Sequence, residues 1–85
     1  MPEYIAYVAA PQAEASRLEQ ALESEPLTTG VNVNETKSTA EVEVQLSALS
    51  FVAATQKAVD AYARLRAAAG LEELEPLYGF VGPAA

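Results

Sequence analysis

The sequence predicts an α+β fold in which helices cover one face of an antiparallel β-sheet. Three features support this prediction. Apolar and polar residues alternate between Val31 and Leu46, which is typical of half-buried strands. The run from Glu3 to Ala10 is almost continuously apolar, as in a central strand. Two segments, 12–25 and 51–69, carry apolar residues at helical spacing.

The first half of the chain is expected to form a strand, a helix and a second strand. Pro11 follows the first strand at a position where a helix begins without losing a hydrogen bond, because first-turn N–H groups have no partner within a helix. The expected helix covers residues 12–25 and ends before Pro26. Its apolar stripe consists of Ala15, Leu18, Ala21 and Leu22.

The alternating segment is expected to fold as a hairpin with its turn at residues 35–38. Side chains on a strand point to opposite faces in turn, so one set must lie beneath the helices and the other outside. The set expected beneath the helices is Val31, Val33, Val42, Val44 and Leu46. The set expected outside is Asn32, Asn34, Glu41, Glu43 and Gln45.

The second helix is expected from Phe51 to Ala69, with Ser47 or Ser50 as its N-cap and Gly70 as its C-terminal stop. One face of this helix is expected to carry Val52, Thr55, Val59, Tyr62 and either Leu65 or Arg66, flanked by Ala54, Ala58, Ala61 and Ala69. Asp60 and Arg64 have the spacing of a helical ion pair. An acidic connector, 71–75, then leads to a last strand at 77–81, and Pro76 and Gly79 favour an edge position for that strand.

Two strand–helix–strand halves with right-handed crossovers give a ferredoxin-like βαββαβ sandwich, a four-stranded antiparallel sheet with both helices on one face. Residues 3–10 and 40–46 are its expected central strands. Residues 1–81 are expected to form a single domain and residues 82–85 a loose tail. A chain of 85 residues rich in alanine has a thin core, which favours self-association or a partner surface.

Composition excludes several classes of function. The formal charge of −7 repels a nucleic-acid backbone, so no nucleic-acid partner is expected. The absence of Cys and His removes thiolate chemistry and the commonest general base and transition-metal ligand. No cofactor or metal is therefore expected. No signal-like or membrane-spanning run is present, so the expectation is a soluble, cytoplasmic protein without a membrane partner.

The sheet face opposite the helices is the candidate interaction face. The pleat alone does not decide which residues of the first and last strands point outward, so both tyrosines of the first strand are candidates. The candidate face comprises Tyr4, Tyr7, Asn32, Asn34, Glu41, Glu43, Gln45, Tyr78 and Phe80.

An aromatic centre beside carboxylates predicts a small acidic, non-enzymatic protein-interaction module. It would associate with itself as a homo-oligomer, or bind a basic protein as an immunity protein, antitoxin or inhibitor does. The alternative is a metabolite-binding regulatory domain with its site between subunits or between helices and sheet.

Enzymatic functions are disfavoured because no catalytic motif is recognisable. The first loop, 9–12, lacks the arginine of an acylphosphatase, which shares the expected fold. Glu41 and Glu43 would repel RNA from the face that RNA-recognition domains use. The same two carboxylates could act as acid and base, or hold a hard cation with Asn32 and Asn34. Outward polar residues occur on any amphipathic hairpin, which favours the solvated face over such a site.

Overall fold

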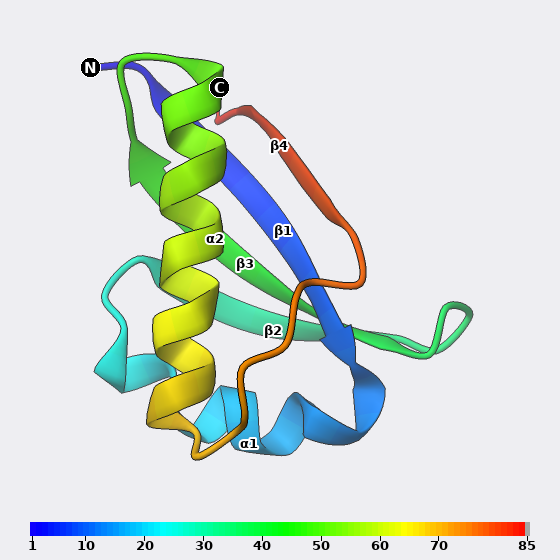
Figure 1. Ribbon diagram of the computed structural model, residues 1–85. Helices are drawn as coiled ribbons and strands as arrows, with labels where there is room; N and C mark the ends of the chain where they lie inside the picture. The colour runs from blue at the N-terminus through cyan, green and yellow to red at the C-terminus, as the bar shows by residue number, and fades with distance from the viewer. Residues whose placement is uncertain (85) are drawn as a thin grey trace.

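The structure, a computed structural model, describes residues 1–84 and contains four strands and two helices. Its elements are β1 (Glu3–Pro11), the 3₁₀ turn η1 (Gln12–Glu14), α1 (Ala15–Gln20), the 3₁₀ turn η2 (Leu22–Ser24), β2 (Thr28–Asn34), β3 (Thr39–Ser47), α2 (Phe51–Ala68) and β4 (Gly79–Pro83). All neighbouring strands are antiparallel, in the order β2-β3-β1-β4. The predicted α+β class and the central position of β1 and β3 are confirmed (Figure 1).

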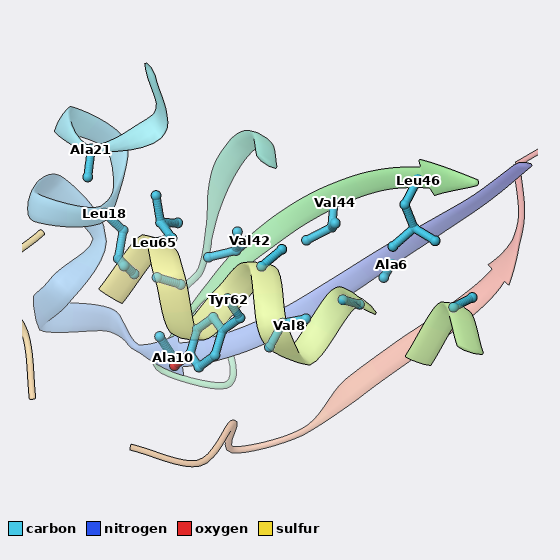
Figure 2. Close-up of a cluster of buried hydrophobic side chains, with 14 of the residues drawn as sticks. Ala6, Val8, Ala10, Leu18, Ala21, Val42, Val44, Leu46, Tyr62 and Leu65 are labelled. Carbon is cyan, nitrogen blue, oxygen red and sulfur yellow. The ribbon is translucent and has the colours of Figure 1, made fainter. Parts of the chain in front are cut away.

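Both helices pack on the same face of the sheet. Leu18 of α1 and Leu65 of α2 are fully buried in a cluster with Val42 and Val44 of β3 (Figure 2). Val31, on β2, packs against the same cluster. The side-chain set expected beneath the helices is therefore found there, except that Val33 lies far enough along β2 to stay about half exposed.

The face that α2 turns toward the sheet is only partly the expected one. Tyr62 and Leu65 are buried as expected, and the contact is completed by the flanking alanines Ala54, Ala58 and Ala61. The prediction was wrong for Val52, which is 76% exposed, and for Val59, which is 38% exposed. Alanines lie at the contact because their small side chains let the helix approach the sheet closely. The valines are left on the outer side of α2, where they form exposed apolar surface.

The first helical segment is also shorter than expected. Residues 12–25 form a single α-helix in the sequence-based prediction, but the structure has only six α-helical residues between two 3₁₀ turns. The N–H groups of Ala21 and Ser24 bond to carbonyls three residues earlier, at 3.1 and 2.9 Å. This tighter winding is common at helix ends, and here it keeps Leu18 and Ala21 buried as the chain turns toward β2.

The ends of α2 agree with the prediction. The Ser50 hydroxyl accepts a hydrogen bond from the Ala53 N–H at 3.1 Å, so Ser50 is the N-cap. Gly70 has φ +73°, and the N–H groups of Gly70 and Leu71 bond to the carbonyls of Ala67 and Arg66. This is a Schellman ending, in which glycine adopts the left-handed conformation at little cost.

The expected pairing of Asp60 with Arg64 is not found. Arg64 donates instead to the buried Glu25 carboxylate, at 2.8 and 3.1 Å, and Asp60 accepts from the Gln56 amide. The pKa of Glu25 is lowered, first by the Arg64 hydrogen bond. Arg64 therefore joins α2 to the segment before β2 rather than stabilising its own helix.

The chain end beyond residue 81 is more ordered than expected. β4 continues to Pro83, and the Ala84 N–H donates to the Glu3 carbonyl at 3.1 Å. An edge strand tolerates the proline because it needs hydrogen bonds on one side only. Ala85, the last residue of the expected tail, lies outside the described residues. Neither helix of residues 1–84 combines the length and apolarity that crossing a bilayer requires.

Candidate functional site

The candidate site is the sheet face without helices, which we call the open face. Strand register defines it, because directly paired residues point to the same side. Tyr7 of β1 lies opposite Glu43 of β3 on one side and opposite Phe80 of β4 on the other. Asn32 and Glu41 are likewise paired. The predicted residues found on the open face are Tyr7, Asn32, Asn34, Glu41, Glu43, Gln45, Tyr78 and Phe80.

Tyr4 is the exception among the predicted residues. It lies three positions before Tyr7, on the other side of the pleat, and it packs against the core cluster beneath the helices. Including both tyrosines was therefore wrong for Tyr4. Period-two geometry allows only one of two residues at odd spacing to face outward.

Tyr78 spans the open face from the β4 side to β3. Its carbonyl accepts the Ala9 N–H at 2.9 Å, so the residue lies beside β1. Its hydroxyl lies 3.0 Å from Thr39 Oγ1 and donates to Glu41, both on β3. The ring therefore crosses over β1, which explains why Ala9 and Thr39 are buried although they belong to the open face.

Glu41 and Glu43 are held in place by donors from neighbouring strands. Asn34 Nδ2 donates to Glu41 at 3.3 Å, in addition to Tyr78. Thr29 Oγ1 donates to Glu43 at 2.7 Å, and Tyr7 lies directly opposite Glu43 in the strand register. These charge-assisted bonds orient the two carboxylates.

The two phenols of the face remain protonated donors at neutral pH. A hydrogen bond to Glu43 is the main cause that raises the pKa of Tyr7 above its usual value, followed by burial. A hydrogen bond to Glu41 is the main cause that raises the pKa of Tyr78. In both cases a nearby carboxylate disfavours the phenolate. The face therefore offers carboxylate acceptors and neutral aromatic rings, not a phenolate nucleophile.

Phe80 is the most exposed aromatic side chain of the open face, at 61%. Its ring leans along β4 over Gly82, since a Cβ on Gly82 would lie 3.1 Å from the ring carbons Cε1 and Cζ. Tyr7 and the half-buried Ile5 lie beside it on β1. The three side chains form an apolar centre bordered by Glu43 on the adjacent strand.

The cations of this protein are all engaged within residues 1–84. Arg64 and Arg66 pair with Glu25 and Glu14, and Arg17 and Lys57 donate to backbone carbonyls. The Lys37 ammonium lies 4.7 Å from the centroid of the Tyr78 ring. In this part of the chain, ten of the twelve carboxylates consequently have no ion-pair partner.

Among residues 1–84, no three His, Cys, Asp or Glu side chains lie together as a group that could hold a metal ion. Glu41 and Glu43 are occupied by hydroxyl and amide donors instead. The open face thus presents oriented carboxylate oxygens near the exposed Phe80 ring.

No local pattern in the sequence predicts that the Tyr78 side chain crosses over β1 or that the Lys37 ammonium lies over its ring. Both depend on which strands become neighbours, and Lys37 reads in the sequence as an ordinary turn residue. No protein family, characterised protein or solved structure shows a significant match to this chain.

Proposed function

We propose that the chain is a non-enzymatic protein-binding module of the ferredoxin-like fold whose open face binds a cationic partner protein. Strand order supports the fold, since it reads β4-β1-β3-β2 from the β4 edge. Helix-containing connections lead into both β2 and β4. Two interleaved strand–helix–strand units with right-handed crossovers produce this order.

The observation that carries the proposed function is the exposed Phe80 ring beside Tyr7, with the fixed carboxylate of Glu43 next to them. Protein interfaces centre on aromatic anchors that become desolvated, and polar groups surround the anchors. Because hydrogen bonds already orient Glu43, little side-chain entropy is lost when it meets a partner. The open face thus combines an anchor with preorganised acceptors.

Charge supports a basic partner over a second copy of this chain. The carboxylates without an ion pair produce a negative field that accelerates encounter with a cationic surface. Two copies meeting face to face about a two-fold axis would bring Glu41 and Glu43 toward the same residues of the other copy. Self-association through this face would therefore work against repulsion. Metabolite binding between subunits or between helices and sheet remains a prediction from the sequence.

Two phenylalanines allow a matched test of the open face. Phe80 is 61% exposed on the open face, and Phe51 is 56% exposed at the start of α2. Partners captured from the native host by immobilised wild-type protein would be purified, and their dissociation constants measured by biolayer interferometry. We expect Phe80→Ser to raise the dissociation constant of a partner that binds the open face by at least about tenfold, because an aromatic anchor is lost. Phe51→Ser should stay within about twofold.

Salt dependence provides the second arm of the same test. The association rate constant is expected to fall as ionic strength rises from about 0.05 to about 0.5 M, because exposed charges are screened. The proposal would be contradicted if the captured partners bind Phe80→Ser as tightly as wild type. It would also be contradicted if their association rate constants do not change with ionic strength.

A further inference from the structure

A groove of about 400 Å³ lies between α2 and the connector that leads to β4, and none of its lining residues belongs to the open face. Figure 1 shows this connector, in orange, running back along the C-terminal half of α2. The apolar residues that line the groove are Val59, Ala63, Ala67, Leu71, Leu74 and Pro76. Its volume falls within the range of small binding clefts.

The groove exists because α2 has small residues where the connector passes. Ala63 and Ala67 are exposed and leave a depression, and the larger side chains of Val59 and Leu74 form its walls. Val59 is 38% exposed and Leu74 is 42% exposed, so apolar surface on both walls meets water. An apolar side chain inserted between them would remove that surface from water.

The groove is preformed by contacts of Arg66, which is 2% exposed. Its Nε donates to the Glu72 carbonyl at 2.9 Å, and its backbone carbonyl accepts the Leu71 N–H at 2.9 Å. Its terminal nitrogens donate to the Glu14 carboxylate. Arg66 therefore fixes the connector against α2, and its pairing with Glu14 leaves no uncompensated positive charge to attract an anionic ligand.

The rim of the groove is acidic. Glu73 and Glu75 line it, and Glu72 lies in the same connector. None of the three has an ion-pair partner within residues 1–84. A ligand that complements this groove therefore carries an apolar group for the hollow and positive charge for the rim.

We propose that the groove binds a peptide segment of a partner protein, with a Leu, Met or Phe side chain in the hollow and Lys or Arg residues against Glu73 and Glu75. A peptide is favoured over a small organic cation because the rim carboxylates are spread along an extended connector. A chain with several cations can reach them at once, as in other groove-bound peptides. This site is separate from the open face and does not depend on the function proposed for it.

Random peptides displayed on phage and selected on the wild-type protein supply the probe. Enriched peptides are expected to combine a Leu, Met or Phe with flanking Lys or Arg. Synthetic copies of the two most enriched peptides would then be titrated by fluorescence anisotropy against wild-type protein and variants. Amide shifts in ¹⁵N-labelled protein are expected at Val59, Ala63 and Leu74.

Val59 and Val52 form a matched pair for this titration. They are the same residue type on the same helix, two turns apart, and only Val59 lines the groove. We expect Val59→Ser and the groove-filling Ala63→Leu each to raise the dissociation constant of the peptide by at least about tenfold. Val52→Ser should change this constant by no more than about twofold. Ala63 is an exposed helix position, so leucine there should not prevent folding.

Charge reversal at two positions separates the effect of the rim carboxylates on peptide affinity from the effect of the net charge of the protein. Glu73→Lys is expected to lower peptide affinity by at least about tenfold, whereas Glu23→Lys, at an exposed position outside the groove, should change it by less than about threefold. Phe80→Ser should have no effect, which distinguishes this site from the open face.

Three results would overturn the proposal. One is a selection that yields no cationic peptide with an apolar anchor. Another is peptides that bind Val59→Ser and Ala63→Leu as well as wild type. The third is that hexylamine, a small organic cation, shifts the amide signals of Val59, Ala63 and Leu74 while no selected peptide shifts them.

Discussion

The Val44→Asp variant is expected to lose cooperative unfolding altogether. Val44 is 0% exposed and lies at the centre of β3 beneath the helices. An ionised carboxylate there has no partner, and burying it costs more than about 4 kcal/mol. A domain of this length has a free energy of unfolding of only about 4 to 13 kcal/mol. Circular dichroism against urea concentration should show a broad, non-cooperative change in the variant.

Gln45→Asp is the matched control, because the neighbouring side chain points to the open face and is exposed. The same carboxylate there stays hydrated, and we expect the free energy of unfolding to change by less than about 1 kcal/mol despite the nearby Glu43. Equal destabilisation by both variants would contradict the assignment of the two faces.

The Arg66→Met variant is expected to lose about 3 kcal/mol of unfolding free energy. Methionine keeps the aliphatic bulk but removes the cation that binds Glu14, the Tyr62 hydroxyl and the Glu72 carbonyl. The Glu14 carboxylate, which is 20% exposed, would then lack its partner at the junction of α1 and α2. Urea unfolding followed by circular dichroism measures the loss.

Lys57→Met provides the comparison on the same helix. Lys57 is exposed and its ammonium donates only to the Ser47 backbone carbonyl, so its loss leaves no buried charge without a partner and the expected cost is below about 1 kcal/mol. The double variant Glu14→Leu with Arg66→Met should be more stable than Arg66→Met alone, because no uncompensated carboxylate remains. If Arg66→Met costs no more than Lys57→Met, Arg66 does not act as the buried link between α1 and α2.

The sheet was predictable from the sequence because its signal is local. Alternation between Val31 and Leu46 assigns each side chain to a face without knowledge of its neighbours. The same rule, applied from Tyr7 to Tyr4, would place Tyr4 beneath the helices once one residue of β1 is assigned. The alternation does not say which set of β1 side chains lies beneath the helices. That assignment comes from the register of β1 with β3.

The packing of α2 was predicted for Tyr62 and Leu65 but not for Val52 and Val59, because the larger valines were preferred to the alanines beside them. Ala54, Ala58 and Ala61 recur at helical intervals, as Val52 and Val59 do, and only tertiary packing decides between the two stripes. The structure selects the alanines, and this choice leaves Val59 beside the groove.

The long-range polar contacts could not be derived from the sequence. Arg66 and Glu14 are 52 residues apart, and Tyr78 and Glu41 are 37 residues apart. Spacing rules cover pairs within a helix or across a hairpin, so they suggested Asp60 for Arg64 and nothing for Tyr78. Such pairs become visible only when the sheet order and helix positions are fixed.

Carboxylate footprinting of the open-face complex tests the central claim most directly. The protein would be labelled with a carbodiimide and glycine ethyl ester, free and bound to a captured basic partner, and the modified residues quantified by mass spectrometry. We expect binding to protect Glu41 and Glu43, while Glu19 and Glu23 on the helical side react as in the free protein. Protection of Glu19 and Glu23 with Glu41 and Glu43 unchanged would show that the partner binds elsewhere and would contradict the proposed function.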